Sequence, residues 1–413
     1  MPPVWVVAAL PWILLPIILL LRARGSVPLS RYPPASPAAE HQPAPLAAGS
    51  AGLPLVSVIV PARNEAHNIA ACIRSILSTT YPSMEVFVVD DHSTDGTGDI
   101  ARRVAADDPR LTVIGAPPLP DGWFGKQWAC HSAVQRARGE LVLFTDADTR
   151  HTPELLPRAV AALGERGADL TSVMGAQELG GFWERLLQPQ VFTFILARYG
   201  STEAMSRSSR PVDKIANGQF FLVRRAFYDK CGGHEAVRDH VAEDLRIAQE
   251  VCRAGGVVHF VDGRDYLSTR MYQGLGELMR GWGKNVYAGG RDSLELGRLG
   301  RIALRVMYPI PALWNVWPVL MELVAGFGVL PPPVLWWGAT CYAASVLFWM
   351  LVNHEFGVPA WHALLYPVAA AMMAWLLALA AWRGDRVEWK GRAYRSVPAG
   401  ERSRPVDRAN GAR

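Results

Sequence analysis

Hydrophobic and polar positions alternate through the middle of the chain in blocks that predict strands and helices in turn. Short apolar runs bounded by turn residues predict buried strands, and apolar positions three or four residues apart predict helices. The predicted strands are 55–61, 86–89, 111–114 and 141–144, and the helices between them are 69–77, 97–105 and 127–138. This order implies an α/β fold, a Rossmann-like, mostly parallel sheet with helices on both faces and a ligand site beyond the carboxyl ends of its strands.

Four longer apolar segments flank this region. The first, 4–21, carries no charge, is long enough to cross a hydrocarbon core of about 30 Å, and is followed at once by Arg22 and Arg24. Positive charge after the apolar run favours an uncleaved anchor with its N-terminus outside, and a secretory signal is the alternative. Three further segments near the end of the chain predict helical membrane segments: 308–330, 334–352 and 361–382.

The distribution of basic residues conflicts with an odd number of membrane crossings among the three later segments. Arginines precede 308–330 and follow 361–382, which places both flanks in the cytoplasm. Three full crossings would separate the basic tail from the catalytic domain, so one segment is expected not to cross. The candidate is 308–330, which is broken by three prolines and carries Glu322.

The chain is therefore expected to divide into five parts. The linker among them is rich in Pro, Ala and Ser and is expected to be too poor in apolar residues to pack. The parts are a transmembrane anchor at 1–24, the linker at 25–53, a catalytic domain at 54–295, interfacial and transmembrane helices at 296–382, and a basic tail at 383–413.

Composition supports a membrane protein of a reducing compartment. The formal charge of +5 comes from basic residues beside apolar segments and in the tail, which favours topology signals over a nucleic-acid partner. Five cysteines, odd in number and without a CxxC pair, indicate neither a disulfide framework nor a zinc site. Fifteen tryptophans suit membrane interfaces. We expect a multi-pass protein of the cell inner membrane with a cytoplasmic catalytic domain.

Polar clusters follow the predicted strands where an open α/β sheet builds its site. The first strand ends in Pro61-Ala-Arg-Asn-Glu65, and the second is followed by Asp90 and Asp91. Two adjacent carboxylates can accept hydrogen bonds from a base or a ribose, and a plain turn is the alternative. Ligand contact is the favoured interpretation for Asp90 and Asp91.

A second acidic cluster follows the strand 141–144. Asp146 and Asp148, with one residue between them, can share a divalent cation that also holds phosphate oxygens. An exposed turn produces the same pattern, but the position after an apolar strand favours a metal. Lys126, some twenty residues earlier, is a plausible partner for a diphosphate.

Glu243 and Asp244 begin a predicted helix with an apolar face. Acidic residues in a first helical turn are common because they complement the helix dipole. A group transfer to a hydroxyl at this site, however, would need a carboxylate that takes the acceptor proton, and Asp244 is the candidate. Three histidines are expected near the site, and His234 is the most plausible one for metal binding or proton transfer; the others are His92 and His240.

These clusters, in this order, resemble the family 2 inverting glycosyltransferases of the GT-A fold, and within them the membrane-bound bacterial type associated with hopanoid or carotenoid lipids. The resemblance covers about residues 55–292. The motifs that carry it are 56–65, 88–97, 123–129, 145–149, 217–219, 232–233 and 243–244, with 389–394 similar to the membrane-flanking ending of that subgroup.

The resemblance implies a set of roles. A nucleotide sugar, foremost a UDP-sugar, and Mg²⁺ or Mn²⁺ are the implied cofactors, and a lipid is the implied acceptor of a single sugar with inverted configuration. Asp244 would be the general base beside Glu243, and Asp146 and Asp148 would hold the metal. The implied donor contacts are Pro61, Glu65, Asp90, Asp91, Lys126, Asp146, Gly232 and Gly233.

One departure from the family argues against polymer synthesis. Polysaccharide synthases carry a Gln-x-x-Arg-Trp segment, whereas this chain has Leu278-Met-Arg-Gly-Trp-Gly-Lys284. Arg280 and Trp282 are expected to serve either the diphosphate or an interfacial helix at 272–287. Two alternatives remain: a polyprenyl-phosphate sugar synthase, which needs no general base, and a membrane scaffold with a degenerate nucleotide-binding domain.

Overall fold

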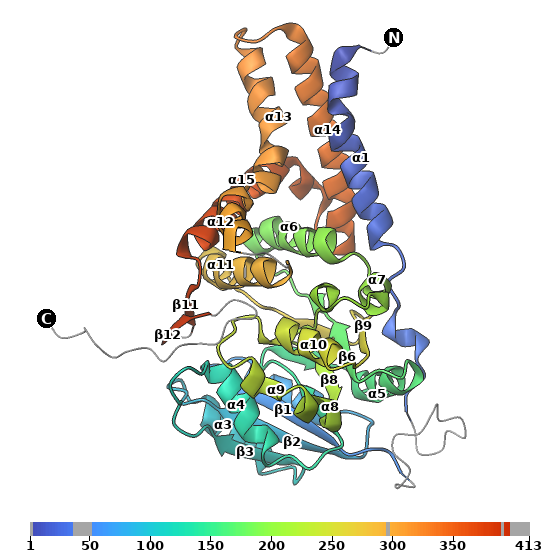
Figure 1. Cartoon of the computed structure of the whole chain (residues 1–413), viewed down its shortest axis with the longest axis vertical. Helices are drawn as coiled ribbons and strands as arrows, with labels where there is room; N and C mark the ends of the chain where they lie inside the picture. The colour runs from blue at the N-terminus through green and yellow to red at the C-terminus, as the bar shows by residue number, and fades with distance from the viewer. Residues whose placement is uncertain (1–2, 36–51, 295–297, 390–391, 397–413) are drawn as a thin grey trace, which may run out of the picture.

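A computed structural model describes residues 3–35, 52–294, 298–389 and 392–396. The α/β domain forms the lower part of the molecule in Figure 1, and three long helices rise from it at the top. A layer of shorter helices lies between the two parts. The α/β domain and the long apolar helices therefore lie at opposite ends of the molecule.

A seven-stranded sheet forms the centre of the α/β domain, with the order β3-β2-β1-β4-β8-β6-β9. β1, β2, β3 and β4 run parallel, and β8 pairs antiparallel with both β4 and β6. The strands are β1 (Val56–Ala62), β2 (Met84–Asp90), β3 (Leu111–Gly115), β4 (Leu141–Phe144), β6 (Leu170–Met174), β8 (Phe221–Arg224) and β9 (Val258–Asp262). The predicted mostly parallel sheet is confirmed.

Helices cover both faces of this sheet because its strands are apolar on both sides. Val58 and Val60 of β1 pack on one face with α2 and α5, whereas Ile59 packs on the other with α4 and α10. The helices of the domain are α2 (Ile69–Leu77), α3 (Thr97–Ala105), α4 (Gly125–Val134), α5 (Leu155–Glu165), α8 (Arg225–Lys230), α9 (Gly233–Ala236) and α10 (Glu243–Arg253). Buried parallel strands of this kind lose the period-two pattern of half-exposed sheets.

Two small sheets complete the strands. One has the order β5-β10-β7, and the other is a hairpin of β11 and β12 at the end of the described chain. Their bounds are β5 (Thr149–His151), β7 (Ala176–Gln177), β10 (Leu267–Thr269), β11 (Arg386–Trp389) and β12 (Arg392–Arg395).

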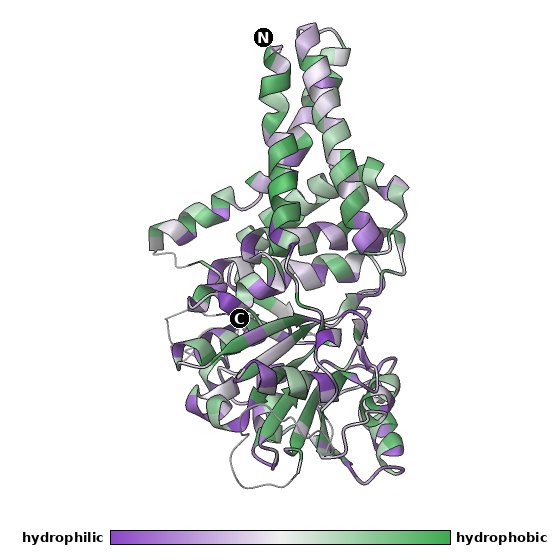
Figure 2. Ribbon diagram, turned by 90° about the vertical axis from the view of Figure 1, so that its right-hand side faces the viewer, coloured by the Kyte–Doolittle hydropathy of each residue, from purple (hydrophilic) through white to green (hydrophobic). Residues whose placement is uncertain are grey.

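The remaining helices form the layer above the sheet and the apolar top. In Figure 1, α6, α11 and α15 lie across the molecule, and α1, α13 and α14 rise together away from the sheet. Figure 2 shows α1 hydrophobic along most of its length. Their bounds are α1 (Val4–Ala23), α6 (Phe182–Tyr199), α7 (Thr202–Arg207), α11 (Leu275–Asp292), α12 (Arg298–Met307), α13 (Ile310–Gly326), α14 (Pro332–Glu355) and α15 (Tyr366–Arg383), with short 3-10 turns at Leu29–Arg31, Pro211–Asp213 and Ala360–Leu365.

Three described helical segments are long and apolar enough to cross a membrane: Val4–Ala23, Pro332–Glu355 and Ala360–Arg383. Half of the last one is buried within the protein, against 11% of the first. α15 packs its alanines, leucines and Met373 on Leu187 of α6 and on Trp282 and Tyr287 of α11. α15 is therefore the most enclosed of the three candidate spans. The proline-broken 308–330, which the sequence favoured as the segment that does not cross, contains α13, which is not among these candidates.

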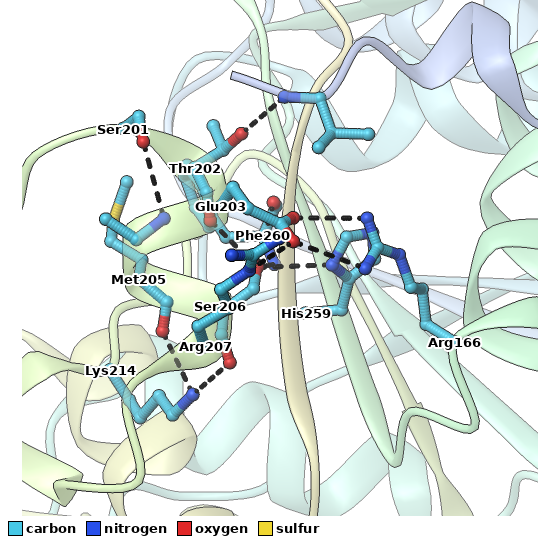
Figure 3. Close-up of polar contacts among 12 residues, drawn as sticks. Arg166, Ser201, Thr202, Glu203, Met205, Ser206, Arg207, Lys214, His259 and Phe260 are labelled. Atoms are coloured by element: carbon cyan, nitrogen blue, oxygen red, sulfur yellow. Dashed lines mark hydrogen bonds and ion pairs between the residues drawn. The ribbon is translucent and has the colours of Figure 1, made fainter. Parts of the chain in front are cut away.

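The first part of the expected flexible linker is packed, which corrects the prediction for residues 25–35. Leu29 and Tyr32 are fully buried, and the Tyr32 hydroxyl lies 3.2 Å from His259 Nε2 and accepts a hydrogen bond from Arg166 Nε at 2.8 Å. The Val27 N–H donates to Thr202 Oγ1 at 2.9 Å. Figure 3 shows the polar contacts around α7 beside this segment, among them the ion pair of Glu203 with Arg166. Burial of Leu29 and Tyr32 holds this segment against the α/β domain. Residues 36–51 of the predicted linker lie outside the described chain.

Candidate active site

A cavity of about 2720 Å³ opens beyond the carboxyl ends of β1, β2 and β4. This is the edge where an open α/β sheet places its ligands. Eight of the residues predicted for the site line the cavity: Pro61, Glu65, Asp91, Lys126, Asp146, Asp148, Glu243 and Asp244. Side chains from the ends of three strands and from the first turns of α4 and α10 therefore converge on one space.

Lys126, in the first turn of α4, joins the two acidic clusters. Its Nζ lies 2.7 Å from Asp146 Oδ1 and 2.7 Å from Glu243 Oε1. Burial alone would lower the pKa of Lys126, but Asp146, Glu243 and Asp244 outweigh it and raise the pKa well above 10.5. The ammonium is thus charged at neutral pH, and it is held where an anionic ligand would meet both clusters.

Asp244, in the first turn of α10, is held by backbone donors. Its Oδ2 accepts a hydrogen bond from the Gly218 N–H at 2.6 Å, and its Oδ1 accepts one from the Leu245 N–H at 2.7 Å. Burial and the neighbouring charge of Glu243 nevertheless raise the pKa of Asp244 from 3.8 to about 7. A carboxylate with a pKa near neutrality is well matched to the role of a general base.

Asp148 lies deeper in the same cavity. Burial, followed by the charges of Asp146 and Glu65, raises the pKa of Asp148 from 3.8 to about 7. Its Oδ1 is buried and has no hydrogen-bond partner. Among the described residues, no group of three or more His, Cys, Asp or Glu side chains gathers to hold a metal. A cation here would have two carboxylates from the protein and would take its other ligands from elsewhere.

Asp91, after β2, is the most enclosed of the predicted donor contacts, at 2% exposed. Its Oδ2 lies 2.7 Å from Arg392 Nη1 and 3.8 Å from Arg63 Nη1, and its Oδ1 lies 3.1 Å from His92 Nδ1. Its carboxylate is therefore surrounded by nitrogen donors of the protein itself.

Three residues predicted for donor binding do not line the cavity. Asp90 turns toward α3, where its Oδ1 accepts a hydrogen bond from the Ser93 N–H at 3.1 Å, so it caps a turn. Gly232 and Gly233 have φ values of 81° and 50° and form the turn between α8 and α9. A Cβ on Gly233 would lie 2.4 Å from the Tyr228 ring, so these glycines serve local packing.

The structure gives the three histidines different surroundings. His234 is buried, its Nδ1 lies 2.8 Å from the Tyr228 hydroxyl, and its ring packs 4.6 Å from that of Phe144. Burial lowers the pKa of His234 well below 6.5, so it is a neutral core residue away from the cavity wall. His92 contacts Asp91 as described, and His240 Nδ1 lies 2.9 Å from Asp239 Oδ1.

Gly218 is a site residue that the sequence reasoning did not single out. A Cβ at this position would lie 3.0 Å from Lys126 Nζ, 3.1 Å from Asp244 Oδ2 and 3.4 Å from Asp146 Oδ2. The residue thus lies at the centre of the charged cluster, and its N–H fixes Asp244. The available signal was the Asn217-Gly-Gln219 motif, which had no assigned role.

The cavity continues from the charged cluster toward the apolar helices. Its wall there includes Phe192 and Phe194 of α6, Leu20 of α1, Met307 of α12 and Val352 of α14. Arg280 and Trp282 of α11 also line it, and Trp282 is largely buried against Phe192. One end of the cavity is therefore charged, and the end at the helices combines apolar side chains with charged ones such as Arg198, Lys284 and Glu355.

Comparisons with known proteins agree with this arrangement. Residues 57–232 match the model of glycosyl transferase family 2. The 4,4'-diaponeurosporenoate glycosyltransferase of Staphylococcus aureus (strain USA300) is 28% identical over 240 residues, which are 57% of this chain and 61% of that protein. A mannosyltransferase from Pyrobaculum calidifontis, solved in complex with GDP-Man and Mn2+, superimposes with a TM-score of 0.53 at 21% identity over 92% of this chain and 96% of its own.

The match with the staphylococcal relative spans about three fifths of that relative's length. The solved structure shares the GT-A-type fold with this chain. The family model covers the segment from β1 to the turn before α9, which includes the first two acidic clusters. Residues 57–232 are therefore similar to a glycosyl transferase family 2 domain, as the ordered motifs of the sequence indicated.

Proposed function

We propose that the chain is a membrane-bound inverting glycosyltransferase, which moves a single sugar from a nucleotide-sugar donor to the hydroxyl of a lipid acceptor. The observation that carries the proposal is the cluster of Lys126, Asp146, Glu243 and Asp244 around Gly218. This cluster lies in a cavity whose wall also includes apolar side chains of the helices.

Asp244 acts as the general base in this proposal. Its pKa of about 7 leaves a large fraction of the carboxylate able to accept a proton at neutral pH. The Gly218 N–H holds Oδ2 in a fixed orientation, at 2.6 Å. The acceptor oxygen loses its proton to Asp244 as it attacks the anomeric carbon from the face opposite the departing diphosphate, so the configuration inverts.

The leaving diphosphate binds beside Lys126 in this proposal. Asp148 Oδ1, buried and without a hydrogen-bond donor, and the nearby Asp146 carboxylate suit Mg²⁺ or Mn²⁺, whose remaining ligands would be diphosphate oxygens and water. The cation, when bound, neutralises charge that develops on the diphosphate. Glu65 and Asp91 contribute to the nucleoside end, and we expect a UDP-sugar as the donor. The related fold of the Pyrobaculum protein holds GDP-Man and Mn2+.

A lipid acceptor could contact the apolar side chains that α1, α6, α12 and α14 contribute to the cavity wall. The staphylococcal relative is named for glycosyl transfer to 4,4'-diaponeurosporenoate, a carotenoid. An acceptor held between these helices would present its polar end to Asp244 while its apolar body stays among apolar side chains, where it avoids the cost of hydration.

We further propose an orientation in the inner membrane that removes the conflict with the distribution of basic residues. α1 crosses once from outside, and α15 lies at the cytoplasmic surface against α6 and α11. α14 crosses together with α13, which rises beside it in Figure 1 although its 17 residues make it shorter than the three candidate spans. The hairpin of β11 and β12 then lies on the same side as the catalytic domain. Reporter fusions test this: a fusion after residue 329 is expected to report an external location and a fusion after residue 396 a cytoplasmic one, and the reverse result would refute the arrangement.

The decisive experiment offers the purified full chain a panel of nucleotide sugars with Mn²⁺ or Mg²⁺ and measures release of free nucleoside diphosphate with and without membrane lipid. We expect turnover of one donor that increases with lipid and disappears in Asp244→Asn. Full activity in that variant would favour an acceptor that attacks through a phosphate or carboxylate oxygen. If no donor is bound or turned over, the proposed function fails.

A further inference from the structure

The hairpin of β11 and β12, which follows α15, packs against the nucleoside end of the candidate donor site. The Tyr394 ring stacks on that of Phe124, with centroids 4.2 Å apart and planes at 13°. The Gly125 N–H donates to the Tyr394 hydroxyl at 3.4 Å. In Figure 1 the hairpin lies below α11, beside the upper end of the α/β domain. A segment that follows the apolar helices therefore contacts the first turn of α4, where Lys126 lies.

Arg392 of this hairpin forms the shortest ion pair of Asp91, at 2.7 Å from Oδ2. The pair fits only because residue 125 is glycine: a Cβ there would lie 2.4 Å from Asp91 Oδ2 and 2.7 Å from Arg392 Nη1. A carboxylate as buried as Asp91 needs a charged partner, since an unpaired buried charge is strongly destabilising. Arg392 meets this need from a segment some 300 residues later in the chain.

Ser396, directly after β12, links the hairpin to the segment that precedes α10. The Val241 N–H donates to Ser396 Oγ at 3.4 Å, and Arg291 Nη2 donates to the same oxygen at 3.3 Å. The buried Arg291 side chain also pairs with Asp385, just before β11. Val241 precedes Glu243 and Asp244 by two and three residues. The hairpin therefore contacts both the nucleoside end and the segment that leads to the general base.

We propose that Arg392 is a positioning residue for the nucleotide donor: by holding the Asp91 carboxylate it fixes the nucleoside end of the pocket and the adjacent first turn of α4. The inference rests on the proposed function, because it assigns a residue to the same donor site. It also gives the hairpin a role beyond the membrane flank, since the segment that leaves the last apolar helix completes the donor pocket.

The test measures donor binding separately from transfer, using the full chain in detergent. Arg392→Ala and Arg392→Lys are titrated with UDP and with GDP by calorimetry, and the donor KM and kcat are measured with the sugar that the wild type uses. We expect Arg392→Ala to weaken nucleotide binding and raise the donor KM by about tenfold, the size expected for loss of a charge-assisted hydrogen bond. The kcat at saturating donor should change far less, and lysine should restore part of the binding.

Arg138→Ala is the matched control, because Arg138 pairs with the largely buried Glu85 at 3.0 Å near the amino end of β2, away from the cavity. It should leave the KM unchanged. A double substitution, Asp91→Asn with Arg392→Ala, should weaken binding no more than the stronger single substitution, since the two residues act as one unit. Should Arg392→Ala fail to fold, Arg392→Lys carries the test with an expected loss of about threefold.

The outcomes separate this inference from the proposed function. If the wild type binds nucleotide and the folded Arg392 variants bind it equally tightly, the positioning role is overturned. The glycosyltransferase proposal then still stands. Tighter binding in Arg392→Ala would also overturn it, because the hairpin would then obstruct the pocket. A wild-type chain that binds neither nucleotide and turns over no donor would overturn both.

Discussion

Replacing Asp244 by asparagine should abolish transfer while making the folded chain more stable. Asparagine keeps an oxygen that can accept the Gly218 N–H now 2.6 Å from Oδ2. It cannot take a proton from the acceptor, so a general base that contributes about 10²- to 10⁴-fold is lost. We expect kcat to fall by at least about 100-fold, equivalent to about 2.7 kcal/mol in the activation barrier.

The free energy of unfolding should rise in this variant, because ionisation of the buried Asp244 carboxyl is unfavourable in the folded wild type. Its pKa is raised from 3.8 to about 7 by burial and by Glu243. Between these two values the unfolded chain has released a proton that the folded chain still holds, so stability falls as pH rises and the full penalty is present above pH 7. The upper limit is about 4 kcal/mol, which solvent at the cavity wall reduces. The neutral asparagine should remove this penalty. It has one acceptor oxygen instead of two, so the Leu245 N–H, now 2.7 Å from Oδ1, loses its hydrogen bond at a cost of about 1 kcal/mol, and a net gain in stability remains.

Two measurements on the purified protein check this. Release of nucleoside diphosphate gives kcat, and thermal unfolding at pH 6 and pH 8 gives the stability of Asp244→Asn against wild type, with the larger gain expected at pH 8. Asp99→Asn is the control, because Asp99 also lies in a first helical turn but is 74% exposed on its side chain. If Asp244→Asn were inactive and also less stable at pH 8, the loss of activity would reflect misfolding, and the assignment of the base would be refuted.

Three further predictions follow from the site and the fold. The wild-type kcat should fall about tenfold per pH unit below the Asp244 pKa of about 7 and level off above it, and a flat profile from pH 5 to pH 8 would contradict the role of this base. Gly218→Ala should lower kcat by about tenfold or more, because its Cβ would lie 3.0 Å from Lys126 Nζ, and unchanged kinetics would show that the cluster tolerates the methyl group. Removal of divalent cations with a chelator should abolish turnover, and added Mn²⁺ should restore it. Asp148→Asn should need far more Mn²⁺ than the wild type for the same turnover. Turnover that persists in the chelator would exclude the proposed metal.

The α/β architecture was readable from the sequence because it depends on local patterns. The strand predicted at 141–144 and the helix predicted at 97–105 have the observed bounds of β4 and α3, and the resemblance to family 2 glycosyltransferases is confirmed by the family model. Buried strands are short apolar runs and the helices have one apolar face, so each element carries its own signal. The acidic clusters followed from the rule that ligands bind at strand ends.

The sequence was a poorer guide where a residue's role depends on distant partners. It could not show that Asp90 turns away from the cavity, that the Gly232–Gly233 pair packs on Tyr228, or that Leu29 and Tyr32 are buried. Each outcome depends on a contact with a segment far away or on a local backbone angle that neighbouring letters do not determine.

The sequence by itself determined which chemical groups the chain offers and the order in which they leave the strands of one sheet. Only the tertiary structure decided which of them meet: Lys126 between Asp146 and Glu243, Gly218 beneath Asp244, and Arg392 on Asp91. The physical reason is that periodicity is a property of consecutive residues, whereas ion pairs and buried pKa values depend on distances of a few ångströms between segments that can be hundreds of residues apart.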